Sequence, residues 1–255
     1  MRGLLMRLLN LIPTRLFASV LVACVLAGVP MGNAYAQAES QNLSQNLSQT
    51  ASQAMVQAES QTDSQTLSLA DLQQRLAAQT LVRGDFVQTR HMAMFNAPLV
   101  SSGHFLLAQD QGLQWQQTVP FPVSLILTQD KLSQQFADSP AQVVDAKDNP
   151  MVFYFSHLFL SLFEGNTQQL TEQFTVSLTT PNAKEQADGA RWVLTLTPTA
   201  APLNAVFEHI RLSGDQFIDQ LILTEKRGDV TEIAFSHQTT IPATLSKEEQ
   251  RAFQL

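Results

Sequence analysis

Apolar and polar residues alternate with a period of two through most of the chain after residue 81, and this pattern is typical of half-buried β-strands. Val82, Gly84 and Phe86 fall on one face, and Met92 and Met94 continue it, so we expect a long first strand. Similar segments follow between turn residues. They are residues 99–108, 113–118, 123–128, 132–136, a short strand near Val143, 174–178, 192–197, 206–212, 217–225 and 230–239.

Helical periodicity appears at two places outside the strands. Ser68 followed by Asp71 forms a capping-box pattern, and leucines recur on one face of residues 69–78, so we expect an amphipathic helix there. We also expect a short helix over residues 247–253, at the end of the chain. Several short antiparallel strands with few helices predict an α+β fold that is mainly antiparallel β, built as a strongly curved, unclosed barrel.

Residues 151–163 are apolar in nearly every direction, with four phenylalanines among ten apolar residues out of thirteen. Asn149 and Pro150 indicate a helix start, and Gly165 indicates its end. Such a helix is about 20 Å long, too short to span a bilayer. Because a helix that is apolar all round needs cover on several sides, we expect it to lie over the concave face of the sheet.

The chain begins as an export signal. Three arginines precede an apolar run, no acidic residue occurs before Glu39, and Ala34-Tyr35-Ala36 fits a cleavage site, so we expect residues 1–36 to be a signal peptide. Leu21-Val22-Ala23-Cys24 also fits a lipidation box ending in the one cysteine. Because the apolar run continues past Cys24, we favour cleavage after Ala36; a lipid anchor at Cys24 is the alternative.

Composition changes twice after the signal. Residues 37–66 are rich in Gln, Ser and Ala, so we expect a flexible tether, and residues 67–255 are long enough for one domain. Removing residues 1–36, which hold three arginines and no acidic residue, lowers the net charge from −7 to −10. An acidic chain is poorly suited to phosphate backbones, so we expect no nucleic-acid partner.

No constellation of residues predicts catalysis. The five histidines lack the spacing of a metal pair, and no nucleophile elbow or phosphate loop occurs, so we expect no metal, cofactor or catalytic residue. Ser156 and His157 are neighbours, which point about 100° apart in a helix, and we interpret them as a polar notch. Asp85, Glu208 and Asp219 read as solvated strand faces rather than an acid–base pair.

An ordered series of motifs resembles the periplasmic outer-membrane lipoprotein carriers, the LolA family, and its LolB-type relatives. It runs Gly84-x-Phe86-x-Gln88, Pro98, Gly103-x-Phe105, Leu113-x-Trp115 and Pro120, followed by the strand–turn–strand of residues 125–132. The resemblance implies an unclosed barrel whose concave side is lidded by helices over an apolar cavity for acyl chains. It also implies a lipoprotein or lipid cargo, an inner-membrane donor and an outer-membrane acceptor.

One position departs from the family pattern. Where the carriers have an Arg-Pro pair whose arginine helps to hold the lid, this chain has Gln109-Asp110. Gln109 is our candidate lid contact, but a neutral amide cannot make the charge-assisted hydrogen bonds of an arginine. The cargo could therefore be a lipid-like amphiphile other than a lipoprotein.

The sequence therefore predicts a periplasmic, monomeric, non-enzymatic carrier that binds acyl chains. A LolB-like receptor anchored through Cys24 and a hydrolase with an unrecognised site remain alternatives. The predicted cavity residues are those whose alternation or helix position turns them inward: Phe86, Phe105, Trp115, Leu125, Leu127, Phe153, Phe155, Phe159, Phe163, Leu194, Leu196, Leu221 and Phe235.

Overall fold

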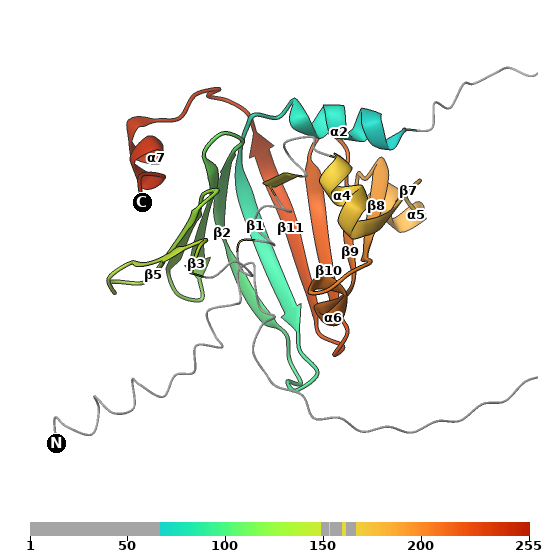
Figure 1. Cartoon of the computed structure of the whole chain (residues 1–255), viewed down its shortest axis with the longest axis horizontal. Helices are drawn as coiled ribbons and strands as arrows, with labels where there is room; N and C mark the ends of the chain where they lie inside the picture. Colours follow the sequence, from blue (N-terminus) through green and yellow to red (C-terminus); the bar gives the residue numbers. More distant parts are fainter. Residues whose placement is uncertain (1–66, 149–152, 154–159, 162–166) are drawn as a thin grey trace, which may run out of the picture. The chain divides into compact units, whose positions relative to one another are not determined.

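The computed structural model describes residues 67–148, 153, 160, 161 and 167–255. Strands dominate these residues and form one antiparallel sheet in the order β6-β5-β4-β3-β2-β1-β11-β10-β9-β8-β7 (Figure 1). The strands are β1 Leu81–His91, β2 Leu99–Ala108, β3 Gly112–Val119, β4 Val123–Leu127, β5 Lys131–Phe136, β6 Gln142–Asp145, β7 Phe174–Thr179, β8 Trp192–Pro198, β9 Phe207–Gly214, β10 Ile218–Glu225 and β11 Val230–Thr239.

The sheet is open because its two end strands, β6 and β7, do not pair with each other. It is also curved. Leu125 on β4 and Leu194 on β8 belong to one buried cluster, although six strands separate β4 from β8 in the sheet order. Side chains from both halves can share a core only where the sheet bends toward that face. The predicted unclosed, curved, mainly antiparallel fold is confirmed.

Helices occupy the ends and connections of the sheet. They are α2 Leu69–Ala77, α4 Thr167–Gln173, α5 Ala183–Ala187, α6 Leu203–Val206 and α7 Lys247–Ala252. Helix α2 begins at the predicted capping box, because the Ser68 hydroxyl accepts from the backbone N–H of Asp71 and the Asp71 side chain accepts from that of Ser68. No helix of the described residues is long and apolar enough to cross a membrane.

Three details differ from the sequence predictions. Strand β1 ends at His91, so Met92 and Met94 lie in the β1–β2 turn instead of continuing the strand. Helices α4, α5 and α6 were not predicted. Helix α7 was predicted, but the residue after it, Phe253, packs on Leu106, which points to the outer face of β2. The helices therefore do not all cover one face.

The two faces of the sheet carry separate apolar clusters. We call the larger the interior cluster; it includes Leu72 and Leu76 of α2 together with Phe153 and Leu160. The smaller, which we call the outer cluster, consists of Leu81, Leu106, Ala108 and Phe253. Alternate residues of one strand thus enter different clusters, as the period of a strand requires.

Candidate ligand-binding site

The described members of the predicted cavity set lie together. All ten belong to the interior cluster or pack against it: Phe86, Phe105, Trp115, Leu125, Leu127, Phe153, Leu194, Leu196, Leu221 and Phe235. Nine of them are buried and Phe235 is partly buried. Phe155, Phe159 and Phe163 lie outside the described residues. The arrangement groups the set on one face, while contact with a ligand stays a prediction.

Two glycine–phenylalanine pairs form the floor of this interior. In the β1–β2 register Gly84 lies opposite Phe105, and Phe86 lies opposite Gly103. A β-carbon on Gly84 would come within 2.7 Å of the Phe105 ring, so the glycine makes room for the ring. The first Gly-x-Phe motif therefore makes room for the Phe105 ring, whereas the glycine of the second, Gly103, lies against the backbone of Gln116 and Gln117 on β3.

Aromatic rings connect the floor to the neighbouring strands. Phe86 and Trp115 stack with ring centroids 3.6 Å apart. Phe105 and Phe235 meet edge to face at 5.1 Å, and Trp115 and Phe235 do so at 6.3 Å. Three adjacent strands and β11 thus contribute to one aromatic layer, which leaves little free space.

A small apolar cavity remains between this layer and α2. Its volume is about 30 Å³. Its lining is formed by Leu76, Gln79, Val82, Phe105, Leu107, Leu113, Trp115, Phe217, Ile218, Phe235 and Gln238. The Gln238 amide donates to the Ile218 carbonyl and to the Asp219 carboxylate, both at 3.0 Å, so that polar group is already satisfied. The free space has apolar walls and is about large enough for one water molecule.

Helix α2 contributes Leu76 to the cavity lining, and Leu72 of the same helix packs in the interior cluster; both are almost fully buried. One ion pair joins the helix to the β9–β10 turn: Arg75 Nη1 lies 3.3 Å from Asp215 Oδ1 and donates to the Asp215 carbonyl at the same distance. Both side chains are partly exposed, and such pairs contribute at most about 1 kcal/mol. Apolar contact therefore holds α2 more than charge does.

Gln109 lies at the end of β2, near the entry into β1. Its backbone N–H donates to the Thr80 carbonyl at 2.9 Å, and its side chain is partly exposed. This position is beside the C-terminal end of α2, which ends at Ala77. A role for Gln109 in holding a lid stays a prediction.

The opposite end of the inner face is ionic, which the sequence analysis did not predict. Arg90 is buried and follows Phe86 by four residues on β1, so it lies on the same face of the sheet. Its guanidinium lies 3.3 Å from the carboxylate of Glu225 and 3.6 Å from that of Asp229. Arg227 binds the same two carboxylates at 2.7 and 3.0 Å. Two guanidinium groups thus neutralise two buried carboxylates, and the apolar part of the interior ends at this network.

A second polar group lies on the outer face. Asp85 accepts from Nδ1 of His104 at 2.6 Å and from Nδ1 of His237 at 2.8 Å. Both hydrogen bonds lower the pKa of Asp85, and the bond from His104 has the larger effect. No hydroxyl among the described residues bonds either ring, and no three metal-binding side chains gather within that part of the chain. Strand register could have revealed this trio, because the three residues lie on adjacent strands.

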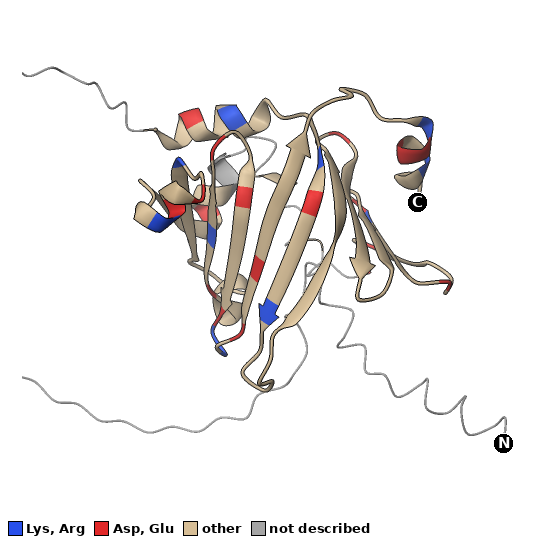
Figure 2. Cartoon of the chain, turned by 180° about the vertical axis from the view of Figure 1, so that it is seen from behind, with Lys and Arg blue, Asp and Glu red and all other residues tan. Residues whose placement is uncertain are grey.

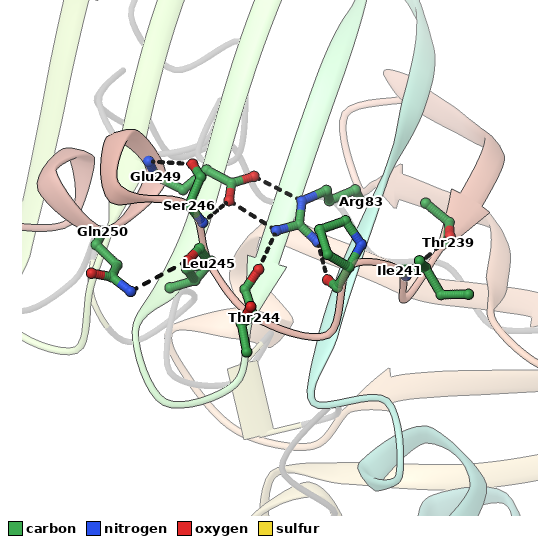
Figure 3. Close-up of polar contacts among 9 residues, drawn as sticks. Arg83, Thr239, Ile241, Thr244, Leu245, Ser246, Glu249 and Gln250 are labelled. Atoms are coloured by element: carbon green, nitrogen blue, oxygen red, sulfur yellow. Dashed lines mark hydrogen bonds and ion pairs between the residues drawn. The ribbon is translucent and has the colours of Figure 1, made fainter.

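The outer face also has a wide polar hollow of about 840 Å³ between α7 and strands β1 to β4. Arg83 lies in it and forms what we call the C-terminal clamp: it donates to Glu249 at 2.7 and 2.8 Å and to the carbonyls of Pro242 and Thr244 at 2.7 and 3.1 Å (Figure 3). The hydrogen bond from Arg83 lowers the pKa of Glu249 to about 2. Paired charges line this hollow, so it suits an apolar ligand poorly.

The described residues define an open antiparallel sheet with a helix-covered apolar interior. The family model described as "Outer membrane lipoprotein carrier protein LolA" matches residues 77–248, and the chain belongs to this family. Comparison with curated proteins finds no match.

Two solved structures are similar to the chain. One is a LolA superfamily protein from Nitrosomonas europaea, with 10% identity over 66% of this chain and 91% of that chain and a TM-score of 0.37. The other is a DUF1329 family protein from Desulfovibrio piger, with 13% identity over 73% of this chain and 98% of that chain and a TM-score of 0.32. At these values the family assignment rests on the family model alone.

Proposed function

We propose that this protein is a periplasmic carrier that holds the acyl chains of a lipoprotein or another lipid-like amphiphile between the curved sheet and its helical cover. The observation that carries the proposal is the apolar interior of a LolA-family chain, with a cavity that α2 helps to line and that has no charged residue in its lining. Binding and release are the whole function, and no bond is made or broken.

The described interior side chains leave little free space between them. A space of about 30 Å³ accepts roughly one water molecule and not an acyl chain. A ligand therefore enters only after interior side chains move, and the almost fully buried side chains outside the strands include Leu72, Leu76, Phe153 and Leu160. The carrier alternates between this tightly packed state and a wider, loaded state.

Energies of burial make that exchange feasible. Each methylene removed from water contributes about 0.8 kcal/mol, so ten methylenes contribute about 8 kcal/mol. Exposing Leu72 and Leu76 costs about 1.5–3 kcal/mol each. A loaded carrier is thus favoured over an empty one, but by a margin small enough for an acceptor with its own apolar surface to remove the ligand.

Location and partners follow from the sequence predictions. Residues 1–36 direct export, residues 37–66 tether the carrier domain, and the cargo moves from an inner-membrane donor to an outer-membrane acceptor through a monomeric carrier. Labelling with a radioactive fatty acid tests the alternative of a lipid anchor. Incorporation that disappears in the Cys24→Ser variant would favour a lipid-anchored receptor over a periplasmic carrier.

The binding step is tested with an environment-sensitive fluorescent fatty acid. The proposal expects saturable emission with one probe per chain, displaced by unlabelled fatty acid and unaffected by Asp85→Asn, which changes only the outer face. A probe that does not bind, or that Asp85→Asn releases as readily as an interior substitution does, contradicts the proposal.

A further inference from the structure

The β1–β2 hairpin ends in an apolar tip that has no cover from the described residues. Met94 is 75% exposed and Phe95 is 50% exposed, and every residue from Ala93 to Val100 is exposed. Figures 1 and 2 both show this hairpin extending beyond the turns of the neighbouring strands. A projecting methionine and phenylalanine are not needed to close the core, which lies on the inner face above them.

Exposed apolar residues continue from the tip onto adjacent strands. Val87 on β1 lies opposite Ser102 on β2, which in turn pairs with Val119 at the end of β3. Val87, Val100 and Val119 are all exposed, as is Phe121 just after β3. The register therefore joins the tip and the outer ends of three strands into one patch, which we call the tip patch.

The charge around the tip patch differs from that of the whole chain. The chain has a net charge of −7, yet residues 86–109 contain no aspartate or glutamate. The adjoining β10–β11 turn exposes Lys226 and Arg227, and it is tied to the hairpin by a hydrogen bond of 3.1 Å from the Ala93 N–H to Asp229. Figure 2 shows no charged residue in the tip itself.

Two of the acidic groups at this end are paired with arginines, whereas Glu232, opposite Thr89 on the neighbouring strand, is partly exposed. Glu225 and Asp229 are buried, and each is bound by both Arg90 and Arg227. Lys226 is exposed and forms no ion pair with another described residue. An apolar projection next to an exposed cation matches the two layers of a membrane surface, which has anionic head groups above apolar chains.

We propose that the tip patch docks this protein on the surface of a bilayer that contains anionic phospholipid, with Met94 and Phe95 entering the interface and Lys226 beside the head groups. A flat bilayer suits a convex, projecting tip, whereas a protein partner for such a patch needs a matching groove. The docking uses no residue of the interior cavity, so its test is independent of whether the interior binds acyl chains.

Vesicle flotation tests the proposal. The probes are vesicles of phosphatidylcholine with and without phosphatidylglycerol. The protein is the exported chain obtained from a Cys24→Ser precursor, so that no acyl anchor can form. The protein is expected to float with the mixed vesicles. Met94→Ser combined with Phe95→Ser should lower the partition coefficient by on the order of tenfold, and Lys226→Gln by about fivefold on mixed vesicles alone.

Ile241→Ser is the matched control, because Ile241 is 78% exposed but lies in the C-terminal segment after β11. It should float like the unsubstituted protein. The proposal is overturned if the protein stays with the unfloated fraction, as expected of a tip that serves a protein partner. It is equally overturned if the Met94/Phe95 variant, shown folded by circular dichroism, floats undiminished or if Ile241→Ser loses as much binding.

Discussion

Replacing Leu107 by alanine should weaken the fold and strengthen acyl-chain binding at the same time. Leu107 is 2% exposed and lines the interior cavity. A buried Leu→Ala substitution costs about 2–5 kcal/mol, through lost transfer free energy and the space left behind. For a domain of this length each kcal/mol lowers the Tm by about 2–4 °C, so a cost near 3 kcal/mol lowers it by about 6–12 °C.

The same substitution adds the volume of the lost side-chain atoms to a cavity of about 30 Å³ with apolar walls. An enlarged dry cavity binds apolar molecules because it recovers the lost contacts. If acyl chains bind there, Leu107→Ala should bind a fluorescent fatty acid more tightly, and the ligand should restore part of the lost stability.

Leu106→Ala is the matched control. Leu106 is adjacent on β2, also buried, and points into the outer cluster against Phe253. It should lower the Tm by a similar amount and leave the affinity for the probe unchanged. The reasoning is refuted if both variants change the affinity equally, or if Leu107→Ala loses stability without any gain in binding.

Three further predictions concern the frame around the cavity. Glu249→Gln should lower the free energy of unfolding by about 1–2 kcal/mol above pH 4.5, a modest loss because solvent screens part of the C-terminal clamp. The pKa of Glu249 is lowered to about 2, so the carboxylate loses its stabilising charge as the pH falls from 4.5 to 2. Urea titrations should therefore show the difference between the variant and the unsubstituted protein shrinking over this pH range. Gly103→Ala places a methyl group against the Gln116 carbonyl oxygen and should lower the free energy of unfolding by about 3 kcal/mol. Gly189→Ala should lower it by about 1 kcal/mol, because nothing lies near its side and the φ of +97° is the sole obstacle. Equal losses of stability would contradict this explanation. Arg75→Gln frees α2 from its ion pair, so stopped-flow mixing should show faster probe entry. An unchanged rate would contradict a role for this ion pair in the opening step.

Strand alternation predicted the inner face well. Phe86, Trp115 and Leu194 were selected by period two alone, and all three lie in the interior cluster. A strand sends alternate side chains to opposite faces, and no bulge interrupts the register at these three positions. The inner face is therefore the part of the site that local pattern determines.

Tertiary contacts decided what alternation could not. Met92 and Met94 continue the pattern of β1, yet the chain turns there with the Phe95 N–H donating to the Met92 carbonyl at 2.9 Å. Helix α5 has an Asn182–Glu185 capping box that was present in the sequence, but its five residues are too few to show a helical period. The outer position of α7 depends on contacts with distant strands, which periodicity does not encode.

The charged groups were the hardest to predict. Arg90 reads as a polar residue on a strand, and only the packing of the β10–β11 turn beside β1 brings Glu225 and Asp229 to it. Asp85 was interpreted as a solvated strand position and the histidines only as lacking the spacing of a metal pair. The bonds from His104 and His237 to Asp85 were missed because they require the register of three strands.

Native mass spectrometry of the protein purified from the periplasm without detergent tests the central claim most directly. The carrier proposal predicts a population heavier than the empty chain by the mass of one lipid or lipoprotein, lost in exchange for added fatty acid. A protein that is empty on purification and takes up no fatty acid under the same conditions would contradict it.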